Sequence, residues 1–320
     1  MNGVWPLAPL PWQAQLWQRM GEQLDAGRLP QAFMLTGAEG VGKLWFLRAL
    51  ASRLLCAGPV AGTACGSCKS CELLKAGSHS DFMALHPEEG SRQIRIEQVR
   101  KLIQFAGRTP ALGSRKILLI GPAELMNSSA ANALLKSLEE PSESTTLLLS
   151  CNNVSALPAT IRSRCQITTH VPPSADTSVP WLQQFVGDAD AAAQAHALFP
   201  GQPLLAAALA DAELLGTWQK AFAGLTALIE GRLTALEYPE LVKELPLDEV
   251  LLLMQRGLEE ALRQHAGVTT LTAALHAAYR LRDDLGRKRR AVIAGGNPNR
   301  QLLVEDYSAK LGRAFRPATS

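Results

Sequence analysis

The sequence predicts an α/β protein in which a parallel β-sheet carries helices on both faces and is followed by a helical C-terminal part. Short, strongly apolar runs at residues 116–120 and 146–150 are typical of central parallel strands, because helices bury both faces of such a sheet. Amphipathic helical segments alternate with such runs between residues 31 and 171, which is the order expected of a doubly wound sheet. From residue 172 to residue 308 the pattern is almost entirely helical.

Composition indicates a globular protein with ample core. The chain has 320 residues, 47% of them hydrophobic and 19% charged, which is enough for two or three domains. A formal net charge of +3 is too small to indicate nucleic-acid binding by itself. The first residues lack the pattern of a signal peptide and no apolar stretch is long enough to span a bilayer, so we expect no membrane association. The spacing of six cysteines suggests metal binding in the reducing cytosol.

Residues 34–44, Met-Leu-Thr-Gly-Ala-Glu-Gly-Val-Gly-Lys-Leu, predict the end of a strand, a glycine turn and the start of a helix. Gly37, Gly40, Gly42 and Lys43 follow a phosphate-loop pattern, in which backbone N–H groups and a lysine bind phosphates. The residue after the lysine is a leucine, where a Ser or Thr hydroxyl would ligate Mg²⁺. The sequence therefore predicts a degenerate nucleotide-binding loop, with a plain strand–helix turn as the alternative.

The acidic residues of a P-loop ATPase are also missing from the expected place. Such enzymes carry carboxylates at the end of a strand beside the loop, and the strand at residues 116–120 runs into Gly121-Pro122 instead. Glu124 is the nearest carboxylate, and we expect it on the following turn. Asp81 and Glu88 do not follow an apolar strand. We therefore expect that nucleotide bound here is not hydrolysed.

Four cysteines form the pattern C-x8-C-x2-C-x2-C within a short glycine-rich insert, which is the ligand number and type of a structural zinc site. An iron–sulfur cluster could use the same ligands, but the tight local spacing favours zinc over it and over free or disulfide-linked cysteines. Four ligands leave no open position for catalysis, and His79 and His86 are not needed as ligands. The predicted ligands are Cys56, Cys65, Cys68 and Cys71.

Taken together, several motifs resemble those of bacterial clamp-loader subunits of the AAA+ superfamily, which belong to the DNA polymerase III holoenzyme. The resemblance rests on the cysteine insert, on residues 132–141 (N-A-L-L-K-S-L-E-E-P), on residues 157–165 (L-P-A-T-I-R-S-R-C) and on residues 295–303, and it covers almost the whole chain. It implies an AAA+ P-loop domain at residues 1–171 with a zinc insert at about 56–71, a helical lid at 172–209 and a C-terminal helical collar at 210–320.

The resemblance also implies roles for single residues. In this family the Ser-Arg-Cys triplet supplies an arginine to the ATP site of a neighbouring subunit; here that arginine is Arg164, with Arg162 close by. An arginine supplied in trans would neutralise charge on the transferred phosphoryl group. From the residues alone, a surface arginine paired with a carboxylate is the alternative. Asn152 lies near the sensor position, and Leu204 stands where motor subunits have a lid arginine.

We therefore expect a non-hydrolysing clamp-loader subunit with structural Zn²⁺, while binding of ATP or ADP stays undecided. The implied partners are the gamma and tau motor subunits and the delta subunit, and through the assembly the sliding clamp and primer–template DNA. The helix expected at residues 128–140 is the face that would meet DNA or a neighbour. Two other classes of protein remain as alternatives: an active P-loop ATPase with a non-standard metal site, and an independent zinc-ribbon protein that binds nucleic acid.

Overall fold

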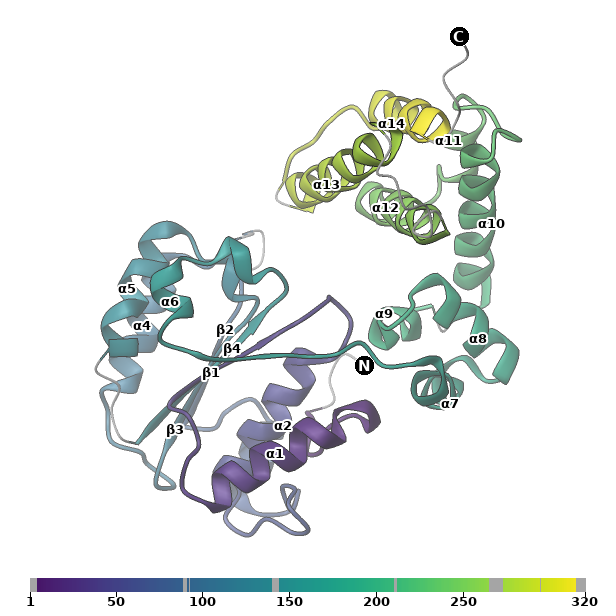
Figure 1. Cartoon of the computed structure of the whole chain (residues 1–320). Coiled ribbons are helices and arrows are strands. Elements are labelled where there is room, and N and C mark those ends of the chain that lie inside the picture. Colours follow the sequence, from purple (N-terminus) through teal and green to yellow (C-terminus); the bar gives the residue numbers. More distant parts are fainter. Residues whose placement is uncertain are drawn as a thin grey trace. The chain divides into compact units, whose positions relative to one another are not determined.

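The computed structural model of the chain describes residues 5–88, 91, 93–139, 144–209, 212–264, 273–293 and 295–314. Contacts within the chain divide it into two compact units, residues 1–208 and 209–320 (Figure 1). The first unit contains the α/β sheet together with the helices of the expected lid, and the second is entirely helical where it is described. The expected division into a P-loop domain at residues 1–171 and a lid at 172–209 stays a prediction, and residue 140, the last of the helix expected at 128–140, lies outside the described residues.

A five-stranded parallel sheet forms the centre of the first unit, as the sequence predicted. Its strand order is β2-β3-β4-β1-β5, so that β1 lies between β4 and β5, and Phe33 is in register with both Leu148 and Gln166. The strands are β1 (Ala32–Thr36), β2 (Phe82–Leu85), β3 (Lys116–Ile120), β4 (Thr145–Cys151) and β5 (Gln166–Thr169).

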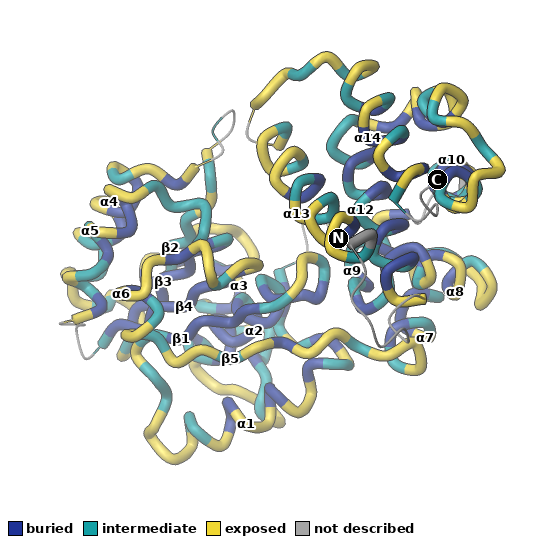
Figure 2. The backbone as a smooth tube through the Cα atoms, turned by 45° about the horizontal axis from the view of Figure 1, so that its top comes forward, coloured by how far each residue is buried: buried dark blue, intermediate teal, exposed yellow. Residues whose placement is uncertain are grey.

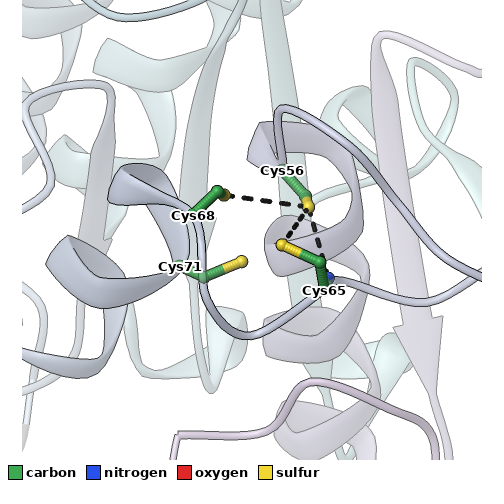
Figure 3. A group of neighbouring side chains, drawn as sticks. All are labelled: Cys56, Cys65, Cys68 and Cys71. Atoms are coloured by element: carbon green, nitrogen blue, oxygen red, sulfur yellow. Dashed lines mark hydrogen bonds between the residues drawn. The ribbon is translucent and has the colours of Figure 1, made fainter.

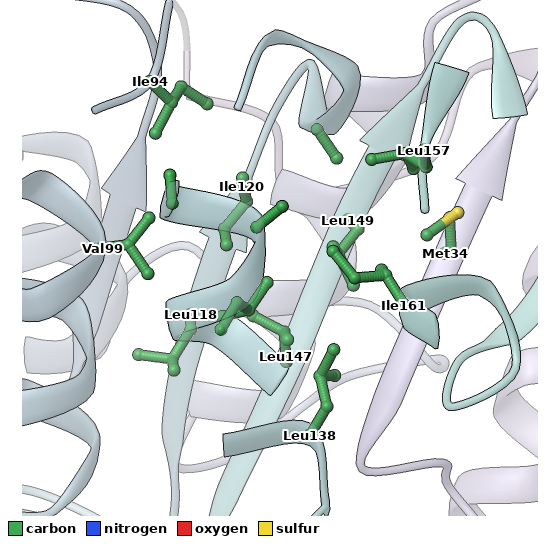
Figure 4. Close-up of a cluster of buried hydrophobic side chains, with 14 of the residues drawn as sticks. Met34, Ile94, Val99, Leu118, Ile120, Leu138, Leu147, Leu149, Leu157 and Ile161 are labelled. Atoms are coloured by element: carbon green, nitrogen blue, oxygen red, sulfur yellow. The ribbon is translucent and has the colours of Figure 1, made fainter. Parts of the chain in front are cut away.

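Successive residues of the central strands face the two opposite helical layers. Phe33 and Leu35 pack against α1 (Ala14–Asp25) and α2 (Lys43–Leu55), whereas Met34 packs on the other side. On that other side α4 (Ile96–Ala106) and α5 (Ser128–Glu139) bury a cluster of aliphatic side chains (Figure 4). The central strands are buried along their whole length (Figure 2), which explains why their sequences are continuous apolar runs.

Five further α-helices and three 3-10 helices complete the described part of the first unit. The edge strands β2 and β5 were not picked out from the sequence, because their residues are half-buried or exposed and do not form apolar runs. None of the described helices is long and apolar enough to cross a membrane. The remaining elements are η1 (Pro11–Gln13), α3 (Lys69–Lys75), η2 (Ala123–Leu125), η3 (Val154–Ala156), α6 (Ala159–Arg162), α7 (Ala175–Val186), α8 (Ala189–Leu198) and α9 (Pro203–Ala207).

The second unit is a helical bundle, as expected. Its core includes Tyr238 and Tyr307, which are almost completely buried, and one apolar face of α12. Gly224 on α10 and Gly257 on α12 lie where a Cβ atom would collide with neighbouring leucine side chains, so the small residues permit close packing of the helices. The helices are α10 (Ala212–Ile229), α11 (Tyr238–Leu241), α12 (Leu247–Gln264), α13 (Ala273–Ile293) and α14 (Arg300–Ala314).

Candidate functional site

The glycine loop connects the end of β1 to the start of α2, as the sequence predicted. Gly37, Gly40 and Gly42 all have positive φ angles, of 148°, 77° and 92°. Residues with a side chain rarely adopt these angles, so the three glycines allow the chain to turn sharply from the strand into the helix. The Gly37 N–H donates to the Cys151 carbonyl at 3.2 Å, which ties the loop to the end of β4.

The lysine of the loop is bonded to the loop itself. Lys43 is 6% exposed, and its Nζ donates to the carbonyl oxygens of Gly37 at 2.9 Å and Ala38 at 2.6 Å. Burial lowers the pKa of Lys43 to about 8, although the nearby carboxylates of Glu124 and Glu39 oppose this shift. To reach a bound phosphate, this ammonium group would have to leave two hydrogen bonds.

An apolar side chain occupies the region where the metal ligands of an ATPase would meet. A Cβ atom built on Gly121, which follows β3, would lie 2.8 Å from Leu44 Cδ2 and would overlap Ser150 Oγ. Leu44 therefore packs directly against the backbone that ends β3. An acidic side chain at position 121 would require the side chains of Leu44 and Ser150 to move, and neither the leucine nor the glycine offers a side-chain oxygen for a metal.

Glu124, which the sequence placed only on a turn after β3, lies close enough to the glycine loop for its charge to act on Lys43. It belongs to η2, and its Oε1 accepts a hydrogen bond from the backbone N–H of Asn152 at 2.9 Å. Its charge acts on Lys43 and on Cys151, whose pKa is raised to about 12 chiefly by burial. The exposed side chain of Asn152 stays a sensor only by prediction. No signal in the sequence placed this carboxylate beside the lysine.

Two other segments of the first unit donate hydrogen bonds to backbone carbonyl oxygens of the glycine loop. The backbone N–H of Leu204, at the start of α9, donates to the Gly40 carbonyl at 3.0 Å. From the N-terminal side, Trp12 Nε1 donates to the Val41 carbonyl and Gln13 Nε2 to the Gly42 carbonyl, each at 2.9 Å. Leu204 thus brings an aliphatic side chain, rather than an arginine, to the lid position that faces the loop.

The four cysteines predicted as metal ligands lie together at the end of α2 and the start of α3 (Figure 3). All four Sγ atoms lie within 4.8 Å of one another, and Cys56 Sγ is 3.5 Å from Cys65 Sγ and 3.9 Å from Cys68 Sγ. A tetrahedral zinc ion with Zn–S bonds of roughly 2.3 Å separates its sulfur ligands by about 3.8 Å. The arrangement is therefore compatible with a structural zinc site.

Local backbone groups prepare one of these thiols for ionisation. The N–H groups of Ser67 and Cys68 lower the pKa of Cys65 to about 6. His79 lies outside the cluster, because its Nδ1 accepts a hydrogen bond from the backbone N–H of Asp81 at 3.0 Å. The structure therefore places the four cysteines, and not the neighbouring histidine, in one cluster.

Arg164 lies at the end of the sheet where the parallel strands start, whereas the glycine loop lies at the end where they finish. It precedes β5, whereas the loop follows β1, and these two neighbouring strands are parallel. A strand of five residues spans about 16 Å, which separates the arginine from the loop of its own chain. Arg164 Nη2 is 2.6 Å from Glu139 Oε1, and its Nη1 donates to the Thr160 carbonyl at 3.0 Å. The Arg164 side chain is still 35% exposed, and it is paired with a carboxylate, which is the alternative stated from the residues alone, although Glu139 was not singled out as the partner.

Comparison with known proteins identifies the family. The sequence model of the family described as "DNA polymerase III, delta subunit" matches residues 12–173, which is half of the chain. The chain belongs to this family. A relative from Pseudomonas aeruginosa, named DNA polymerase III subunit delta', is 46% identical over 198 residues, 61% of this chain and 60% of the relative. The Escherichia coli protein of the same name is 34% identical over 210 residues, 65% of this chain and 62% of that protein.

The chain is also similar to a relative with a different name. The DNA polymerase III subunit tau of Escherichia coli is 34% identical over 142 residues, which cover 44% of this chain and 22% of that protein. The alignments with the two delta' proteins span about three fifths of the length of those relatives. The resemblance stated from the sequence motifs is thereby confirmed at the level of the family.

Proposed function

We propose that this protein is a non-hydrolysing subunit of the DNA polymerase III clamp loader that supplies Arg164 to the ATP site of a neighbouring motor subunit. The observation that carries the proposal is the contrast between Leu44, which fills the metal position, and Arg164, which is held at the far edge of the sheet. By analogy with relatives named delta' and tau, the partners are the gamma and tau motor subunits and the delta subunit.

The missing metal ligands support the non-hydrolysing role. Phosphoryl transfer in P-loop proteins depends on Mg²⁺ held by a hydroxyl and a carboxylate, and positions 44 and 121 carry a leucine and a glycine instead. Gly37, Gly40, Gly42, Lys43 and Asn152 would form the remaining, degenerate nucleotide site. Bound ATP or ADP would have to draw Lys43 away from the carbonyls that it contacts.

The placement of Arg164 supports action in trans. Its guanidinium carries five donors in a fixed plane, and Glu139 and Thr160 hold it at the protein surface. An arginine that enters a neighbour's site completes that site only when the ring assembles. In this role the subunit would help the loader to place a sliding clamp on primed DNA in the cytoplasm, with α5 as the face that meets DNA or a neighbouring subunit.

We assign the cysteine cluster to structural Zn²⁺ held by Cys56, Cys65, Cys68 and Cys71. With four protein ligands the ion has no open position, so its contribution is to fold the insert between α2 and β2. The purified chain is expected to contain one zinc ion, and Cys68→Ser is expected to lose it and to lower the melting temperature. Wild-type protein that is purified without zinc, or that melts at the same temperature before and after a chelator removes its zinc, would contradict this assignment.

An active ATPase is the second candidate, and one observation favours it. Glu124 lies close enough to Lys43 for its charge to raise the lysine pKa, so a carboxylate is present beside the loop after all. It accepts the Asn152 N–H, however, and its turn follows the strand end that Leu44 covers. Hydrolysis by the isolated chain that depends on both Glu124 and Lys43 would favour this second candidate.

Steady-state ATP hydrolysis by the isolated chain and by the assembly with motor subunits tests the proposal. We expect no turnover by the isolated chain, and slower turnover by an assembly that contains Arg164→Ala. Arg19→Ala, an exposed arginine on α1, is the matched control and should leave the rate unchanged. An intact assembly that hydrolyses ATP at the wild-type rate with Arg164→Ala would refute the role of this arginine.

A further inference from the structure

A cavity of about 500 Å³ lies at the amino edge of the sheet, between α4 and α5 and beside Arg164. This volume is within the range of roughly 300–1,000 Å³ that small-molecule sites occupy in proteins. The cavity lies far from the glycine loop, because it lies at the end of the sheet where the strands start, whereas the loop follows the last residue of β1. Its lining consists of Pro30, Gln31, Ala32, Leu102, Ile103, Ala106, Gly107, Leu118, Leu134, Lys136, Ser137, Leu138, Thr145, Leu147, Arg164 and Gln166.

The inner wall of the cavity is aliphatic. Ala32, Ile103 and Ala106 are partly exposed and can contact a ligand, whereas Leu102, Leu134 and Leu118 are at most 2% exposed and belong to the core cluster shown in Figure 4. The three leucines come from α4, α5 and β3, so the cavity continues the packed core of this face of the sheet. An apolar group placed here would be removed from water at a gain of roughly 25 cal/mol per Å² of buried area.

The mouth of the cavity is cationic. Lys136 and Arg164 lie on the rim together with the exposed amides of Gln31 and Gln166, and none of the described lining residues is acidic. The nearest carboxylate with an assigned contact is Glu139, which pairs with Arg164 at 2.6 Å on α5 without lining the cavity. An apolar lining below Lys136, with Arg164 beside it in an ion pair that an anion can exchange, complements a molecule with an apolar body and one anionic group.

We propose that this cavity binds an amphipathic anion, with its apolar body between α4 and α5 and its carboxylate at Lys136 and Arg164. Because Arg164 Nη2 contacts Glu139 in the free chain, the ligand carboxylate competes with Glu139 for the guanidinium. If Arg164 acts on a neighbour's ATP, as proposed above, the bound ligand withdraws the arginine and slows hydrolysis by the assembly. This regulatory consequence rests on the proposed function, whereas the binding site does not.

Titration of the isolated chain with decanoate tests the binding site directly. We expect saturable binding at one site, detected by calorimetry, together with a shift of the Ile103 methyl signals in the NMR spectrum. The neutral analogue decanol should bind roughly three- to fivefold more weakly, because it lacks the charge that the rim attracts. Non-saturating binding, or saturable binding that leaves the Ile103 methyl signals unmoved, would overturn the proposal.

Variants of the two walls and of the rim locate the site. Ala106→Met on α4 and Ser137→Leu on α5 each fill part of the cavity and should weaken decanoate binding by roughly tenfold or more. Lys136→Gln should weaken it roughly three- to fivefold, whereas the control Lys101→Gln, on the exposed side of α4, should not change it. Wild-type affinity in both filled variants, with their folds intact by circular dichroism, would refute the site.

Assemblies with motor subunits test the regulatory consequence separately. Decanoate should slow ATP hydrolysis by the wild-type assembly and should have no effect on an assembly that contains Ala106→Met. If decanoate binds the isolated chain at this cavity but leaves hydrolysis unchanged, the site stands and the proposed role of Arg164 is in doubt. If decanoate does not bind, the site is refuted whatever Arg164→Ala does to hydrolysis.

Discussion

The two ends of the parallel strands differ in this protein. The carboxyl edge is the end of the sheet where the strands finish, and the amino edge is the end where they start. At the carboxyl edge, Lys43 bonds to its own loop and Leu44 packs against Gly121, so polar groups are satisfied internally. At the amino edge, Arg164 is 35% exposed and stands beside an open cavity. The comparison shows that contacts within the chain close the carboxyl edge, whereas the amino edge keeps an exposed arginine, which is the contrast on which the proposed function rests.

The amino edge also contains a buried ion pair whose carboxylate accepts further hydrogen bonds. Lys116 at the start of β3 is 3.1 Å from Asp81, just before β2, and both side chains are at most 3% exposed. The Asp81 carboxylate also accepts the N–H groups of Ala111 and Leu112 at 2.7 Å each. Burial acts to raise the pKa of Asp81, but these hydrogen bonds and the Lys116 ammonium outweigh it and hold the pKa below its ordinary value.

The largest effect on folding is therefore expected at this amino-edge pair. Asp81→Asn should lower the free energy of unfolding by roughly 3–5 kcal/mol, because it leaves the Lys116 charge buried and unpaired. Urea unfolding measures the loss, and Asp25→Asn at the exposed ion pair with Arg53 is the control, with an expected change of about 0–1 kcal/mol. Equal losses of unfolding free energy for the two substitutions would contradict the claim that the Asp81–Lys116 pair is buried and stabilises the amino edge more than a surface ion pair would. Because its pKa is depressed, the stabilisation from Asp81 should be present at neutral pH and lost as the pH falls through that pKa.

The next effect concerns the carboxyl edge. Gly121→Ala places a methyl group against Leu44 and Ser150 and should cost roughly 1–3 kcal/mol. Leu44→Ala in the same chain should recover part of this loss, which a double-mutant cycle by urea unfolding measures. Additive effects of the two substitutions would show that Leu44 does not fill the strand end in solution.

A third effect is a pH dependence at the loop lysine. The pKa of Lys43 is about 8 in the folded chain against 10.5 in the unfolded chain, so the unfolded chain binds the proton more tightly between these values. Relative to Lys43→Met, the wild type should therefore gain stability as the pH rises from 8 to 10.5. Denaturant unfolding of both proteins across this range gives the difference, and a flat difference would show that the lysine is not desolvated.

The central architecture was predictable from sequence because it rests on local patterns. The run at residues 116–120 became β3 with the predicted bounds, since a strand buried on both faces is mainly apolar, and its one charged residue, Lys116, is paired with Asp81. The edge strand β5, Gln-Ile-Thr-Thr, was not singled out because its residues are largely exposed and carry no such pattern. Element boundaries elsewhere differ by one or two residues, as with the predicted strand 146–150 and the observed β4.

The cysteine cluster was predictable from its motif, whereas the contacts of the other candidate residues were not. The motif spacing alone brought the four cysteines to one place, because short turns join them along the chain. The pairing of Arg164 with Glu139 and the packing of Leu44 on Gly121 join residues far apart in sequence. Such contacts depend on how the helices and strands pack, which no local pattern specifies.

The most direct test of the central claim compares two ligands at the ATP site of a motor subunit in the assembled loader. An arginine that stabilises the transition state should matter little for ATP binding and greatly for binding of ADP with aluminium fluoride, which mimics the transferred phosphoryl group. We predict that Arg164→Ala weakens binding of the analogue by roughly 10³-fold and leaves ATP affinity nearly unchanged. Equal affinity for the analogue in both assemblies would contradict the claim that this chain supplies the arginine.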